Sequence, residues 1–98
     1  MGHVKITGES IILSPGSGRF RIHGPATCHD FHDLESAART AIDGLRNDIA
    51  LRAEAAGADN AEIVIDRKDV SAFADGQDIF VESRITAVAT GRPRLVKS

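Results

Sequence analysis

The sequence predicts an α+β fold, a ββαββ two-layer sandwich in which one long helix covers one face of a four-stranded antiparallel sheet. Three observations lead to this prediction. Residues 30–57 have helical periodicity, the segments on both sides alternate as strands do, and glycine-containing turns divide these segments into two pairs. At 98 residues, the chain is expected to form a single domain, residues 1–98, that buries a core without metals or disulfides.

The helix is predicted from Asp30 to Gly57. We expect the Asp30 carboxylate to cap its first turn and Gly57 to adopt the left-handed conformation that ends many helices. Gly44 lies in mid-helix, where glycine costs about 1 kcal/mol relative to alanine. A close approach of the helix to the sheet is the expected reason. Apolar residues recur at steps of three and four along one face, namely Phe31, Leu34, Ala38, Ala41, Ile42, Leu45, Ile49, Ala53 and Ala56.

Two strands are predicted before the helix. Residues 4–6 begin an alternating segment, and residues 11–13 continue it. Gly8 lies between them and is expected to mark a bulge or a bend. The turn SPGSG, residues 14–18, then leads into a second alternating segment at 19–24, so this region is predicted to form a hairpin.

Two further strands are predicted after the helix. A linker at 58–60 leads to a strand that starts with EIVID and runs to a turn at Asp75-Gly76. The last strand is expected from Asp78 to Thr90, and residues 91–98 are expected to form an edge or a tail. One face of the last strand is apolar or small, whereas the other mixes polar residues with Phe80 and Val88.

Composition narrows the class of partner. The net charge of −2 gives no general attraction for nucleic acid or for an anionic membrane, and no apolar run is long enough to span a bilayer. The amino terminus lacks a secretory signal, and Cys28 is the only cysteine. We therefore expect a cytoplasmic protein with no cofactor and with neither nucleic acid nor a membrane as partner.

A group of potential metal ligands precedes the helix. It consists of His23, Cys28, His29 and His32, and thiol and imidazole are ligands that zinc-like metals bind. Their spacing is poor, since no second cluster follows to complete four ligands. A capped helix start that carries histidines is the competing interpretation. A nucleophilic Cys28 with a histidine base is a third, and nothing else in the chain supports it.

Four arginines form a candidate anion-binding group. Arg19, Arg21, Arg92 and Arg94 could gather at one edge of the sheet. Solvated edge charges that discourage the addition of another strand are the competing explanation.

The order of several phrases resembles a known family. A helix running from DLESA to RAEAAGAD, then EIVIDRKDV, then DGQDIFVESRITAVATGRPRL, is similar to the carboxy-terminal region of hydantoinase A/oxoprolinase-type proteins. The similarity covers about residues 30–95. Members of that family are ATP-using ring-opening amidohydrolases or related carboxylases, with the nucleotide site in a large actin-like portion that this chain does not contain. The resemblance therefore implies an accessory module or small subunit, and any activity would belong to a larger complex.

Two functions follow as hypotheses. The first is a non-catalytic structural module that associates, as a homo-oligomer or with a larger subunit, through the sheet face that the helix leaves open. Phe80 and Val88 are the predicted interface residues, because large exposed apolar patches mark interfaces. The second is a small metal- or ligand-binding domain that uses the His/Cys group. An enzyme in its own right is disfavoured, since no acid/base pair is recognisable.

Overall fold

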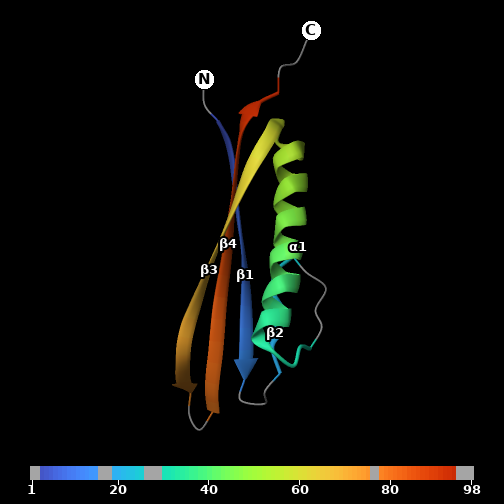
Figure 1. The fold of residues 1–98 in the computed structure, drawn as a ribbon. Helices are drawn as coiled ribbons and strands as arrows, with labels where there is room; N and C mark the ends of the chain where they lie inside the picture. The colour runs from blue at the N-terminus through green and yellow to red at the C-terminus, as the bar shows by residue number, and fades with distance from the viewer. Residues whose placement is uncertain (1–2, 16–18, 26–29, 76–77, 95–98) are drawn as a thin grey trace.

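The fold has the predicted α+β architecture. The computed structural model describes residues 3–15, 19–25, 30–75 and 78–94, except for the side chains of residue 15 and of residues 70–80. The element order is β1 (Val4–Pro15), β2 (Arg21–His23), α1 (Leu34–Ala55), β3 (Ala58–Asp75) and β4 (Asp78–Pro93). All strand pairs are antiparallel, and the sheet order is β2-β1-β4-β3. Figure 1 shows α1 lying along one side of this long sheet, with no described element on the other side.

The N-cap of the helix lies three residues later than predicted, and α1 begins at Leu34. Asp33, not Asp30, is the N-cap: its backbone is extended, and its carboxylate accepts hydrogen bonds from the Ser36 N–H at 2.7 Å and the Ser36 hydroxyl at 3.0 Å. The reason is a tertiary contact. Phe31 and Phe20 exchange two backbone hydrogen bonds of 2.8 and 3.0 Å, which holds Phe31 in an extended bridge that a helix could not include.

The buried face of α1 matches most of the predicted stripe. Leu45 and Ile49 are fully buried at its centre, and Phe31, Leu34 and Ile42 are partly buried against the same core. Ala56 is exposed, contrary to the prediction, because the helix ends at Ala55. The other buried residues of the helix are small, namely Ala37, Ala38, Ala41 and Ala53. Small side chains on this face let the helix lie close to the sheet.

Gly8 does not mark a bulge. β1 pairs with β4 in unbroken register from Val4 to Pro15, with Gly8 opposite Ala87. A Cβ atom at Gly8 would lie only 2.7 Å from Ile49 Cδ1 and 3.1 Å from Leu45 Cδ1. The glycine therefore makes room for the helix within a regular strand.

The predicted hairpin before the helix is present. β1 and β2 are antiparallel neighbours, with Ile12 opposite Ile22, and both side chains are buried under the helix layer. β2 is short because residues beyond His23 leave the sheet, starting at Gly24, whose φ is +148°.

The segment after the helix differs from the predicted linker. Gly57 has the expected left-handed backbone, with φ +84°, but β3 starts immediately afterwards at Ala58, which pairs with Pro93. The pairing shifts between Asp59 and Glu62, and Asn60 has φ +49° within this bulge. β4 likewise extends to Pro93, so part of the predicted tail belongs to the sheet. A bulge lets the strand start early while keeping the later register.

Candidate functional site

Among the described elements, none covers the sheet face opposite α1 (Figure 1). On β4, residues 83, 85, 87 and 89 are buried under the helix, as predicted. The even-numbered residues 84, 86, 88 and 90 lie on the opposite face of the sheet, also as predicted. The register places Thr7, Val88 and Val64 side by side across β1, β4 and β3. Val64 is 58% exposed, and Val88 is half-buried between its neighbours. This uncharged row, Thr7–Val88–Val64, is the centre of what we call the open face.

Charged rows border that centre on both sides. Lys5 and Glu62 flank Thr90 on one side, whereas Glu9 and Asp66 flank Thr86 on the other. These rows make the open face more polar than the predicted apolar patch. Val88 belongs to the open face as predicted, but the side chain of Phe80 lies outside the described residues.

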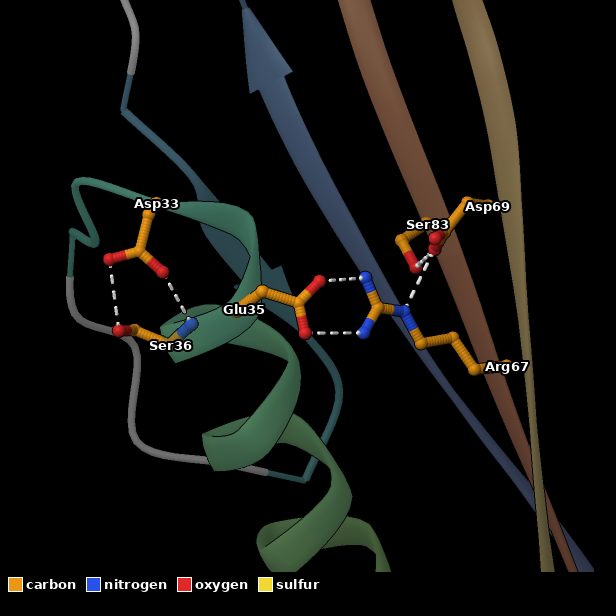
Figure 2. A network of polar contacts seen from close by, with 6 residues as sticks. All are labelled: Asp33, Glu35, Ser36, Arg67, Asp69 and Ser83. Carbon is orange, nitrogen blue, oxygen red and sulfur yellow. Dashed lines mark hydrogen bonds and ion pairs between the residues drawn. The ribbon is translucent and has the colours of Figure 1, made fainter.

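A second candidate is a polar network where α1 begins. Figure 2 shows the Arg67 guanidinium of β3 between Glu35 of α1 and Asp69 of β3. Arg67 donates two hydrogen bonds to Glu35, Nη1 to Oε2 at 3.1 Å and Nη2 to Oε1 at 2.8 Å. Its Nε donates to Asp69 Oδ1 at 2.9 Å. The Arg67 side chain is 24% exposed and that of Glu35 is 71% exposed, so the network lies at the rim between helix and sheet.

Ser83 completes this network from β4. Its hydroxyl is buried and donates to Asp69 Oδ1 at 2.6 Å. This hydrogen bond is the main cause, and the bond from Arg67 the second, of a lowered pKa for the Asp69 carboxyl. The two hydrogen bonds from Arg67 lower the pKa of Glu35, and the two carboxylates in turn raise the pKa of Arg67.

The chemistry of the network suits a structural role, not a catalytic one. Carboxyls with a lowered pKa stay ionised near neutral pH, so Glu35 and Asp69 are poor proton donors. The Ser83 hydroxyl is buried and already used as a donor to a carboxylate, rather than bonded to a base that would activate it. The Arg67 guanidinium therefore joins α1 to β3, and Asp69 joins β3 to β4 through the Ser83 hydroxyl.

The sequence prediction missed this network, although a signal for it existed. Ile63 and Ile65 face the core, and the same alternation places Arg67 and Asp69 on the inward side of β3. Polar side chains on an inward face need hydrogen-bond partners. For Arg67, an acidic residue at the start of the covering helix is such a partner, and Glu35 lies there.

The bulge on β3 borders two hollows. One, of about 250 Å³, lies between the end of α1 and the start of β3, and the other, of about 490 Å³, lies beside the end of β4. Both are lined in part by Asp59 and Asn60. A Cβ atom at Gly91 would lie 3.1 Å from Ala61 Cα and 3.2 Å from the Asp59 carbonyl oxygen, so the bulge is packed against β4 backbone. Packing against β4 therefore explains the bulge, and the bulge by itself does not indicate a ligand site in either hollow.

The predicted metal group is only partly described. His23 ends β2 and His32 precedes the helix cap, and both are exposed, whereas Cys28 and His29 lie outside the described residues. Within the described ranges, no three His, Cys, Asp or Glu side chains come together as a metal site would require. Metal binding by these four residues stays a prediction.

The four arginines do not gather at one edge. Arg19 and Arg21 both lie 3.3 Å from the Asp30 carboxylate, near the hairpin of β1 and β2. Arg92 and Arg94 lie at the far end of the sheet, where Arg92 is paired with Asp59 in the ladder. A common anion site of these four arginines, the less favoured of the two interpretations, is therefore excluded, because the antiparallel order separates the two pairs along the strands.

Comparisons with protein-family models, with curated proteins and with solved structures find no match to this chain. The resemblance to hydantoinase A/oxoprolinase-type proteins stays a prediction. Across the described ranges, no helix has both the length and the apolar character needed to cross a membrane.

Proposed function

We propose that this chain is a non-catalytic module that acts by association, with a second copy of itself or with a larger protein subunit, through the open face. The observation that carries the proposal is the one-sided cover of the sheet. α1 packs on one face, and the centre of the other face is the uncharged row Thr7–Val88–Val64. Flat β-branched rows of this kind pack well against a second surface.

The polar network supports a structural role. Arg67, Glu35 and Asp69 satisfy one another between helix and sheet, with Ser83 as a further donor. We expect these contacts to hold the two layers together and so help the open face keep one shape. A preformed surface loses less conformational entropy when a partner docks on it.

The class of larger partner follows from the sequence resemblance. A large, ATP-using subunit of the hydantoinase/oxoprolinase type is the partner that we propose, with this chain as its accessory piece. A reducing cytoplasm is the proposed compartment, because the single Cys28 has no second cysteine to pair with. Co-purification with such a subunit, encoded beside this chain, tests this part of the proposal. Absence of any complex when the two are co-expressed would contradict it.

The experiment that tests the open face is a matched pair of substitutions. Val88→Lys places a charge at the centre of the open face, whereas Leu51→Lys places the same charge on α1, where Leu51 is 68% exposed. Both positions are accessible enough for the fold to tolerate lysine, which circular dichroism checks. Sedimentation velocity then measures association of the purified chain, and a pull-down measures binding of the large subunit.

We expect Val88→Lys to weaken association at least about tenfold and Leu51→Lys to leave it unchanged, because an unpaired charge buried in an interface costs well over 1 kcal/mol. Equal behaviour of the two folded variants would contradict docking on the open face.

A further inference from the structure

The edge of the sheet formed by β3 is a second surface, separate from the open face. β3 pairs with β4 on one side and with no described strand on the other. An unpaired edge presents backbone N–H and C=O groups that another strand can bind. Register shifts lie between Asp59 and Glu62 and between Val70 and Phe73, so residues 62–70 form a regular stretch between two bulges. This stretch is longer than the typical strand of about 5–6 residues.

The charges on this stretch are incompletely matched within one copy. Lys68 lies directly opposite Arg84 on the open face, and like charges in that position are destabilising. Arg84 is 3.8 Å from Glu9, whereas neither Lys68 nor Glu62 makes an ion pair among the described residues. Within the described part of the chain, Lys68 thus lacks a counter-charge at this edge and Glu62 lacks a cationic partner there.

We propose that a second copy of this chain pairs antiparallel with β3 at this edge, about a two-fold axis at Ile65. In that register Glu62 of each copy lies opposite Lys68 of the other, so the dimer has two such pairs. Ile65 lies opposite Ile65 of the second copy, on the side of the sheet that carries α1. The two sheets then form one continuous antiparallel sheet, with both helices on the same side of it.

Charge selects this register over its neighbours. In a symmetric antiparallel pair, the residue at the two-fold axis lies opposite the same residue of the second copy. Moving the axis from one residue to the next changes the register while outward-pointing N–H groups stay opposite each other. An axis at Val64 would set Glu62 opposite Asp66, and an axis at Asp66 would set that carboxylate opposite its own copy. An axis at Arg67 would place two guanidinium groups opposite each other. Among these, the axis at Ile65 alone places no like charges directly opposite each other; the two Asp66 carboxylates become diagonal neighbours, which are farther apart than directly opposite residues.

The apolar residues of the stretch fit the same register. Val64, which is 58% exposed, becomes a diagonal neighbour of Val64 in the second copy. Ile63 and Ile65 are only partly buried in one copy and pack against its core. A strand added at the edge covers their exposed sides. Edge pairing therefore buries apolar surface as well as supplying backbone hydrogen bonds.

The test uses two charge reversals, Glu62→Lys and Lys68→Glu, with sedimentation velocity as the measurement. Each variant alone sets like charges opposite each other in both pairs, and we expect its self-association to fall at least about tenfold. A mixture of the two variants restores opposite charges in both pairs, so it should form a heterodimer about as strongly as the unchanged chain self-associates. The double variant Glu62→Lys/Lys68→Glu should recover in the same way.

Arg46→Glu is the matched control, because Arg46 is exposed on α1, away from both the open face and the β3 edge. It should leave association unchanged. An unchanged chain that remains monomeric overturns the proposal, as does loss of association in the single variants without recovery in the mixture. If the charge reversals are silent while Val88→Lys abolishes association, the open face binds the second copy and the edge does not. If the charge reversals weaken association while Val88→Lys is silent, the edge binds the second copy and the open face does not.

Discussion

Replacement of Gly8 by alanine tests how closely the helix lies on the sheet. The new Cβ would lie 2.7 Å from Ile49 Cδ1, a separation that real side chains do not tolerate, and 3.1 Å from Leu45 Cδ1. Both of these neighbours are fully buried and cannot swing into solvent. Overpacking of this kind costs typically about 1–3 kcal/mol, and alanine regains about 0.5–1 kcal/mol over glycine in a strand, so the net loss lies between about 0 and 2.5 kcal/mol.

The atom responsible can be removed separately. Ile49→Val deletes Cδ1 and should cost about 1 kcal/mol by itself. In Gly8→Ala/Ile49→Val the closest contact is gone, so the double variant should be more stable than the sum of the two losses predicts, by about 1 kcal/mol. Two contacts remain in the double variant, Leu45 Cδ1 at 3.1 Å and Ile49 Cγ1 at 3.2 Å from the added Cβ, and both require a small adjustment.

Urea unfolding followed by far-UV circular dichroism gives these free energies, since the chain has no Trp or Tyr for fluorescence. Gly91→Ala is the control. Its added Cβ would meet Ala61 and Asp59 instead of Ile49, so its loss should add to that of Ile49→Val within about 0.5 kcal/mol. Additive losses for the Gly8 pair as well would refute the close approach of helix and strand at this point.

The core and the polar network give two further predictions. Leu45→Ala should lower the free energy of unfolding by about 2–5 kcal/mol, whereas Leu51→Ala should change it by less than about 0.5 kcal/mol, because Leu45 is fully buried and Leu51 is exposed; equal effects in urea unfolding would contradict the assigned helix face. The pKa values of Glu35 and Asp69 are lowered in the folded state, so the unfolded chain binds more protons in acid. Their stabilisation is complete above the ordinary carboxyl pKa of about 4 and is lost as pH falls through the lowered values. Unfolding measured as a function of pH should show this loss, and Arg67→Met should make it shallower; an unchanged pH profile in that variant would count against the network.

The sequence predicted the architecture because each element has a strong local signal. Alternation in the strands and the apolar stripe around Leu45 and Ile49 determine which sides face each other, and the structure confirms both. Gly57 was also predicted correctly, since a left-handed residue at a helix end is a local requirement.

The errors occurred where a distant contact decides the outcome. Asp30 and Asp33 are equally good caps by residue type, and only the bridge between Phe20 and Phe31 selects Asp33. Gly8 predicts a bulge or a bend by residue type, but the glycine is required by its close approach to Ile49, which lies far away in the sequence. Neither the Phe20–Phe31 bridge nor the Gly8–Ile49 approach can be predicted from local sequence patterns alone.

The candidate site was predicted less well than the fold. Val88 was placed on the correct face, but the face around it is more polar than the sequence pattern suggested, because Glu9, Asp66 and Lys68 come into its rows only through the register of β1, β4 and β3. The Arg67 network was missed for the same reason, since its partners are supplied by three separate elements.

The most direct test of association is the mass of the unchanged chain in solution. Sedimentation equilibrium over a series of concentrations should show a reversible rise from the 10.4 kDa of one chain toward twice that mass, or a stable complex when the large subunit is present. A chain that keeps the mass of one copy at every concentration, and that also leaves the large subunit unbound, would contradict the account.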